Sequence, residues 1–216
     1  ALAAPRWCRG GGGRAAPARR NAVPGGGILC VDSRCNYYDQ GLAWRQALGF
    51  CLKKDGDVCR VAPAFTHCRA IASSDTAPVA IALGATVVLV GPEAEREVAL
   101  ASMYQDDGKL YLTKADDEVL TTLRLPDPGL WRSSYVKVRS RDSIDFPVLG
   151  VAVSLKMTGP VVVSCRIVLT AVASRPLDFS DSADPFLGPD RDGAVIHVCA
   201  ATASPARVPL QQSDRP

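Results

Sequence analysis

Apolar and polar positions divide the middle of the chain into short, well-bounded elements. Residues 75–84 (DTAPVAIALG) predict a short apolar helix that begins at a cap on Asp75 and ends at Gly84. Residues 85–90 (ATVVLV) predict a strand, because β-branched side chains favour extended backbone. Residues 96–104 (REVALASMY) continue as a strand or a short helix.

The following segment predicts strands joined by tight turns. LYLTKADDEVLTTLRLP predicts a strand, a turn at residues 114–117 and a second strand closed by Pro126. SYVKVRSR alternates in the manner of a half-buried strand. VLGVAVSLKM and VVVSCRIVLTAVA flank Gly159-Pro160, which indicates a hairpin. Antiparallel hairpins with a few helices predict an α+β fold.

The two ends of the chain differ from this middle part. Residues 1–20 contain five arginines and no acidic residue, and their Gly/Ala/Arg-rich sequence has no periodicity. Residues 178–216 are rich in Asp, Pro and Ser, and only residues 194–201 (AVIHVCAA) predict a short strand. We therefore expect an irregular basic N-terminus and an irregular tail.

Composition narrows the class of protein. The formal net charge is +3 over 216 residues, and the basic N-terminus accounts for it, so no nucleic-acid-binding face is predicted. The first 20 residues lack the apolar core of a secretion signal, and no apolar run of about 18 residues predicts a membrane span. Eight cysteines are too few for a typical secreted disulfide scaffold. A cytoplasmic protein is expected.

Four of the cysteines lie in one polar stretch with the spacing C-x15-C-x7-C-x8-C, namely Cys35, Cys51, Cys59 and Cys68. A disulfide framework, a zinc site and an iron–sulfur cluster are the alternatives. Zinc sites usually contain two close Cys pairs, which this stretch lacks. Lys53, Lys54, Arg60 and Arg69 lie nearby in sequence and would offset the negative charge of thiolates. Cys30 is expected beside the site and Cys165 in the core.

Five segments together resemble the FAD-binding subunits of the molybdenum hydroxylases, the xanthine dehydrogenase and carbon monoxide dehydrogenase group. They are RNAVPGGGILC, SSDTAPVAIALGA, DEVLTTLRLP, SYVKVRSRDSIDFPVLGVAV and LTAVASRPL. The cysteine stretch, inserted between the first and second segments, is similar to the insert of 4-hydroxybenzoyl-CoA reductase β subunits, which carries a 4Fe–4S cluster. The resemblance implies that the four cysteines above bind such a cluster.

The resemblance also implies a domain organisation. Residues 21–126 would be a partial FAD-binding domain of the PCMH type with the cluster insert at 35–68. Residues 130–177 would begin an antiparallel sheet of the C-terminal flavoprotein domain. The N-terminal subdomain and the C-terminal helical part of the family have no match here, so we expect a fragment or a reading frame shifted at both ends.

The FAD-binding residues that the resemblance implies are Gly25, Gly26, Gly27, Asn36, Asp75, Leu120 and Lys137. Backbone N–H groups at glycines approach a pyrophosphate closely. Leu120 would pack on the flavin ring, and Lys137 would lie near its N1/O2 edge, where a cation stabilises reduced flavin. The family's glycine motif is changed at Val23, Pro24, Gly25 and Ile28, which predicts weakened FAD binding.

The implied function is electron transfer, with no catalytic residue in this chain. Ferredoxin would reduce the 4Fe–4S cluster, and electrons would pass to FAD, then to 2Fe–2S centres on a small partner subunit. A molybdopterin on a large partner subunit would receive them and reductively remove the ring hydroxyl of an aromatic acyl-CoA. A zinc-stabilised binding module and a nonfunctional fragment are the alternatives.

Overall fold

The computed structural model describes residues 24–140, 145–182 and 187–189. Within them lie helices α3 (Gly25–Leu29), α4 (Leu42–Ala47) and α5 (Ala77–Ala82), and the 3-10 helices η1 (Leu100–Met103) and η2 (Ser180–Ser182). The strands are β1 (Thr86–Val90), β2 (Glu95–Ala99), β3 (Val119–Arg124), β4 (Trp131–Val138), β5 (Leu149–Thr158), β6 (Val161–Thr170), β7 (Leu177–Asp178) and β8 (Gly188–Pro189). No helix among the described residues is long and apolar enough to cross a bilayer.

The first sheet has three antiparallel strands in the order β2-β1-β3. The central strand β1 (TVVLV) is rich in β-branched residues, and its three inner residues are buried. β2 and β3 are edge strands with mostly exposed side chains. A register shift at Val88/Leu89 interrupts the pairing of β1 with β3.

The second sheet has the order β4-β5-β6-β7, and the short β8 also pairs with β6. All of these pairings are antiparallel. β5 and β6 are ten residues each and form the predicted hairpin at Gly159-Pro160, with Gly159 at a φ of +58°. β5 is buried at eight of its ten positions, which accounts for its nearly continuous apolar sequence.

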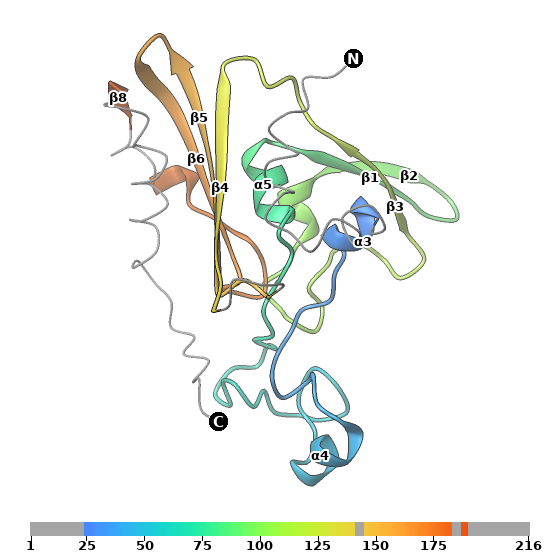
Figure 1. The fold of residues 1–216 in the computed structure, drawn as a ribbon. Helices are drawn as coiled ribbons and strands as arrows, with labels where there is room; N and C mark the ends of the chain where they lie inside the picture. The colour runs from blue at the N-terminus through green and yellow to red at the C-terminus, as the bar shows by residue number, and fades with distance from the viewer. Residues whose placement is uncertain (1–23, 141–144, 183–186, 190–216) are drawn as a thin grey trace.

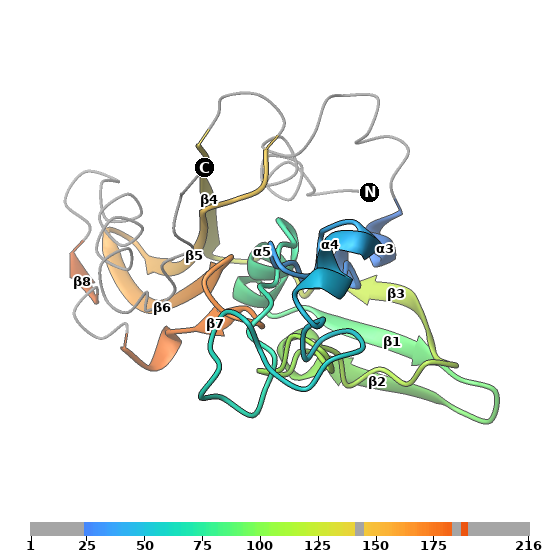
Figure 2. The ribbon, with the colours of Figure 1, turned by 90° about the horizontal axis from the view of Figure 1, so that it is seen from below.

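Helix α5 lies between the two sheets and joins them into one core (Figure 1). Its six residues are all buried, and they pack with β1, η1, Leu29 of α3, and Ala152 and Val168 of the second sheet. A separate apolar cluster, built from β5 and β6 together with Val172, includes Val151, Val153, Leu155 and Cys165. The turned view in Figure 2 places α5 between the same two sheets. The second sheet is therefore packed on both of its faces.

Several predictions from the sequence are confirmed. The α+β class, the helix that ends before Gly84, the strand at 86–90, the strand closed before Pro126, and the 148–173 hairpin are all present. Residues 96–104 contain both alternatives, because β2 passes directly into η1. Buried Cys165 lies in the core as expected. The basic N-terminus and residues 194–201 lie outside the described residues.

Three expectations were wrong. The apolar sequence ILCV after the glycines is typical of a strand, but residues 28–31 form none, because Gly25–Leu29 is a helix. Residues 110–113 form no strand, and Leu112 makes only an isolated bridge to Tyr104. Asp75 is not the helix cap: the Ala77 N–H donates to Ser74 Oγ at 3.2 Å instead.

Gly84 is a position where we expect a large effect from one added methyl group. Its φ is +78°, and a Cβ there would lie 2.7 Å from Nη1 of Arg166. The Arg166 guanidinium stacks on Trp131 with its Cζ 4.4 Å from the ring centroid, so displacing it breaks a second contact. Gly84→Ala should lower the free energy of unfolding by about 1–3 kcal/mol, measured by urea denaturation.

Gly159→Ala is the matched control for this variant. Gly159 also has a positive φ of +58°, but nothing lies within 4 Å of an added Cβ. Gly159→Ala therefore introduces the backbone strain of a positive φ without a steric overlap. An equal loss of stability in the two variants would contradict the role assigned to Arg166.

Candidate functional site

The cysteine insert forms a lobe whose two ends meet at a narrow neck. The Arg34 N–H donates to the Ile71 carbonyl at 2.8 Å, and the Ile71 N–H donates back to Arg34 at 2.7 Å. The residues between them project away from both sheets and include α4 (Figure 1). This pair of hydrogen bonds closes the insert into a loop at its base.

Tight turns within the lobe bring distant cysteines together. Gly49, Phe50 and Asp55 have φ values of +73°, +61° and +66°, which reverse the chain on both sides of Cys51. The Gly56 N–H donates to the Cys51 carbonyl at 3.1 Å, and the Leu52 N–H donates to Val58. Short turns, and not a packed apolar core, therefore determine the path of this segment.

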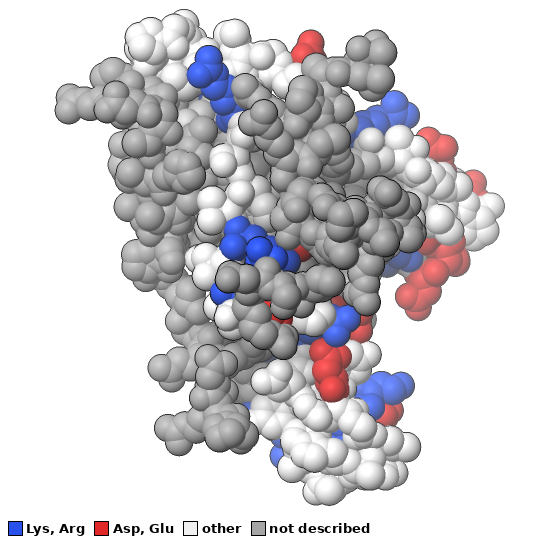
Figure 3. Space-filling view, viewed as in Figure 1, with Lys and Arg blue, Asp and Glu red and all other residues white. Residues whose placement is uncertain are grey.

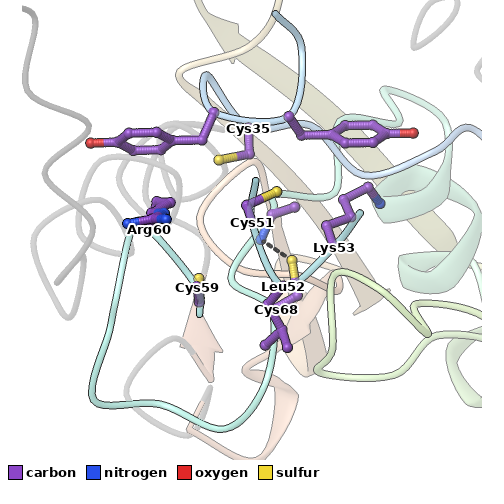
Figure 4. Close-up of a pocket in the computed structure, with 10 residues that line it drawn as sticks. Cys35, Cys51, Leu52, Lys53, Cys59, Arg60 and Cys68 are labelled. Atoms are coloured by element: carbon purple, nitrogen blue, oxygen red, sulfur yellow. Dashed lines mark hydrogen bonds between the residues drawn. The ribbon is translucent and has the colours of Figure 1, made fainter. Parts of the chain in front are cut away.

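All four predicted cysteines line one pocket in this lobe. The lining residues are Cys35, Tyr37, Tyr38, Cys51, Leu52, Lys53, Cys59, Arg60, Cys68 and Ala70. Figure 4 shows the four labelled cysteines around the same part of the lobe, with their sulfurs pointing in different directions. Three of these cysteines are buried and Cys35 is half-buried, and all four thiols are free. No carboxylate and no histidine is among the described residues that line the pocket.

Backbone N–H groups lie beside two of the sulfurs. The Ala70 N–H donates to Cys68 Sγ at 3.4 Å. The backbone of Tyr37 and Tyr38 lowers the pKa of Cys35 against the larger effect of burial. Such donors stabilise negative charge on sulfur. The pocket walls are therefore suited to thiolates.

Burial nevertheless favours the protonated form of two of these thiols, Cys68 and Cys35. It raises the pKa of Cys68 to about 11, against smaller opposing effects from the Ala70 N–H and the Lys53 ammonium. It also raises the pKa of Cys35. A metal group that binds here must displace these protons, so its binding energy includes the cost of their release.

The four cysteines line one pocket but are not arranged as a preformed metal site. Among residues 24–140, 145–182 and 187–189, no group of three or more His, Cys, Asp or Glu side chains is placed to hold a metal ion. Binding of a zinc ion or of a cluster would therefore require the cysteine side chains to move closer together.

The basic residues near the cysteines have different roles from those expected. Lys54 is 57% exposed. Arg69 pairs with Asp106 at 3.1 Å and does not line the pocket. Arg60 lines the pocket, but its guanidinium donates to the carbonyls of Leu48 and Phe50. Only Lys53 lines the pocket with its side chain nearly sealed from solvent.

The glycines predicted to contact FAD form the first turn of α3, against β3. A Cβ on Gly26 would lie 3.4 Å from the Leu120 carbonyl oxygen, so α3 and β3 approach closely there. A Cβ on Gly25 would have no neighbour within 4 Å, which leaves its backbone accessible. The Tyr104 hydroxyl donates to the Leu29 carbonyl and the Tyr111 hydroxyl to that of Cys30, each at 2.9 Å. These bonds anchor the end of the helix.

Asp75, shortly before α5, and Lys137 of β4 form a nearly buried ion pair. Lys137 Nζ lies 2.7 Å from Asp75 Oδ2, with the side chains 9% and 12% exposed. The Tyr135 hydroxyl donates to the other carboxylate oxygen at 3.2 Å. Sequence reasoning missed Tyr135, although the alternation of SYVKVRSR places it on the same strand face as Lys137.

The structure thus brings the predicted FAD residues into two pairs on the edge of one core, Gly26 with Leu120 and Asp75 with Lys137. Asn36 is separate from both pairs. It is exposed in a turn of the lobe and does not line the cysteine pocket.

Known proteins resemble this chain over its central part. The sequence of residues 12–128 matches the family described as FAD binding domain in molybdopterin dehydrogenase. The carbon monoxide dehydrogenase medium chain of Afipia carboxidovorans is 30% identical over 134 residues, which cover 62% of this chain and 46% of that protein.

Solved structures also resemble this chain. Carbon monoxide dehydrogenase from Oligotropha carboxidovorans is 30% identical with a TM-score of 0.52, covering 63% of this chain and 47% of that one. The enzyme from Hydrogenophaga pseudoflava is 26% identical with a TM-score of 0.51, covering 61% and 45%. Quinoline 2-oxidoreductase from Pseudomonas putida 86, at 20% identity and a TM-score of 0.53, covers 87% and 61% and shares the fold.

The chain spans about half the length of the carbon monoxide dehydrogenase chains that it matches. The family match covers more than half of this chain and includes the glycines, Asp75 and Leu120. The protein therefore belongs to the family of FAD-binding domains of molybdopterin dehydrogenases.

Proposed function

We propose that this chain is an electron-transfer subunit of a molybdenum hydroxylase-type oxidoreductase that carries a 4Fe–4S cluster in addition to FAD. The observation that carries the proposal is the pocket of four free thiols in a lobe attached to an FAD-binding domain of this family. The same lobe would be the place where electrons reach the subunit. Free thiols fit the reducing cytoplasm, where we place the protein.

The residues of the pocket fit a cluster better than a single ion. Four cysteine thiolates complete the ligand set of a 4Fe–4S cluster. The spacing of the four cysteines lacks the two close Cys pairs of most zinc sites, which favours a cluster over one zinc ion. The backbone N–H donor at Cys68, and a pocket in which no described lining residue is a carboxylate, also fit thiolate ligation.

The residues proposed for FAD, at the edge of the core that surrounds α5, fit this cofactor in part. The backbone at Gly25 to Gly27 carries no side chain, and it lies beside Leu120, so a pyrophosphate can approach it. Asp75 and Tyr135 hold the Lys137 ammonium in a fixed position. When bound, FAD would accept and pass on the electrons. Asn36 would contribute from the lobe, although its exposed position makes no contact with the other residues proposed for FAD.

The finer assignment is a 4-hydroxybenzoyl-CoA reductase-like system. Ferredoxin would donate electrons to the cluster and FAD would receive them. A small 2Fe–2S subunit and a large molybdopterin subunit would complete the path. The cysteine insert, between two segments typical of the family, supports this assignment. We place the domain with the insert at residues 21–126 and the start of the following domain at 130–177.

The test is anaerobic purification, reconstitution with ferrous iron and sulfide, and analysis of iron, sulfide, zinc and flavin. We expect about four irons and four sulfides per chain, the content of a cubane, and a brown colour that dithionite bleaches. One zinc per chain without iron would overturn the electron-transfer assignment and favour a zinc-stabilised module. A chain that binds neither metal and unfolds without a cooperative transition would be a nonfunctional fragment.

A further inference from the structure

Lys53 connects the cysteine lobe to the FAD-binding domain. Its Nζ donates to Asp32 Oδ1 at 2.7 Å, and to Ser33 Oγ and the Gly108 carbonyl at 2.6 Å each. Asp32 and Ser33 lie shortly after α3, whereas Gly108 lies in the loop between η1 and β3. One side chain of the lobe therefore contacts two segments of the domain on which it sits.

The environment holds this ammonium in one position. The Lys53 side chain is only 6% exposed. Its Nζ lies 4.8 Å from the ring centroid of Tyr38 and 5.4 Å from that of Tyr111. Three acceptors satisfy the three donors of an ammonium, and two aromatic faces cover it. A charge held in this way is screened by solvent far less than one on a mobile surface lysine.

The same residue belongs to the wall of the cysteine pocket. Lys53 follows Cys51 by two positions, and Figure 4 shows its side chain leaving the chain beside that cysteine. Lys53 therefore places a fixed positive charge on a residue of the pocket wall, and a charge added inside the pocket interacts with it.

Gly108 completes this arrangement. A Cβ at Gly108 would lie 2.6 Å from the Ala70 nitrogen, so the loop packs directly on the backbone next to Cys68. The Gly108 N–H donates to the Cys68 carbonyl at 2.8 Å, while its own carbonyl accepts from Lys53. Lys53 and Cys68 are thus held by the two sides of one peptide segment.

We propose that Lys53 is the positioning residue that sets the reduction potential of the group held by the four cysteines. This inference rests on the proposed function of the pocket. In the reaction concerned, one electron from a low-potential reductant enters the group and no proton is taken up. The group gains one unit of negative charge, and a fixed cation beside it stabilises the reduced form.

The experiment is potentiometric titration of the reconstituted chain with dithionite, followed by electron paramagnetic resonance. Lys53→Met should shift the one-electron reduction equilibrium at least tenfold toward the oxidised form, a fall in potential of about 59 mV. Lys53→Arg should keep the potential near that of the wild type. Lys54→Met is the matched control, since the neighbouring lysine is 57% exposed and should leave the potential unchanged.

A second variant, Asp32→Asn, tests the predicted direction of the shift in reduction potential. It also keeps the proposal testable if Lys53→Met no longer binds the cluster. Asp32 is 48% exposed and neutralises part of the Lys53 charge, so Asp32→Asn should raise the potential. Equal potentials for Lys53→Met and Lys54→Met would overturn the proposal. If Lys53→Met binds no iron, an unshifted Asp32→Asn would overturn it. A wild-type chain that takes up no cluster would instead reject the proposed function and this inference with it.

Discussion

Cys59→Ala will lose the iron and sulfide that the wild-type chain takes up on anaerobic reconstitution. Cys59 is only 4% exposed and lines the pocket with the other three cysteines. A cubane with one ligand missing exposes an iron atom to solvent and is readily lost, and the described residues that line the pocket include no carboxylate or histidine as a replacement. We expect iron to fall from about four per chain to near zero, measured by metal analysis and by the visible absorbance.

Cys30→Ala is the matched control for this experiment. Cys30 is a half-buried free thiol only five residues before Cys35, but it packs against the first core and does not line the pocket. It should retain the full iron content. Retention of iron by Cys59→Ala, or equal loss in both variants, would contradict the assignment of the four ligands.

Lys137→Met will destabilise the chain more than any surface substitution. The variant leaves the Asp75 carboxylate nearly buried with only the Tyr135 hydroxyl as a partner. Removing one member of a buried pair costs about 3–5 kcal/mol, because the remaining charge is uncompensated. For a chain of this size the melting temperature should fall by roughly 6 °C or more, measured by thermal denaturation.

Two comparisons test the cause of this effect. Asp75→Asn combined with Lys137→Met removes both charges and should recover most of the lost stability. Lys156→Met replaces an exposed lysine on the neighbouring strand and should change the melting temperature little. If the double variant is no more stable than Lys137→Met alone, the buried charge is not the cause.

The two candidate sites have different relations to the fold. The ion pair and the glycines lie on the edges of the packed core, so their geometry depends on α5 and both sheets. The cysteine lobe is attached at the Arg34/Ile71 neck and shaped by turns. We therefore expect a bound cluster to stabilise the lobe strongly, because metal binding there supplies energy that apolar burial does not.

Local sequence was sufficient to predict the regular helices and strands and to single out the four cysteines as a group. The alternation and β-branched content of β1, β5 and β6, the glycine after α5, and the Gly159-Pro160 turn all act over a few residues, so they can be recognised without knowing the fold. The same holds for the grouping of Cys35, Cys51, Cys59 and Cys68 in one stretch, and the structure places all four in the lining of one pocket.

Contacts between distant segments determined which partners the charged side chains have. Asp75 has the sequence of a helix cap, but its carboxylate contacts Lys137, 62 positions away, and the first N–H of α5 donates to Ser74 Oγ instead. Lys53 and Lys54 are indistinguishable neighbours in sequence, yet only Lys53 reaches Asp32, Ser33 and Gly108. The electrostatic free energy of each of these charged side chains depends on its burial and on the charge of a distant partner. Neither the burial nor the partner exists until the chain has folded.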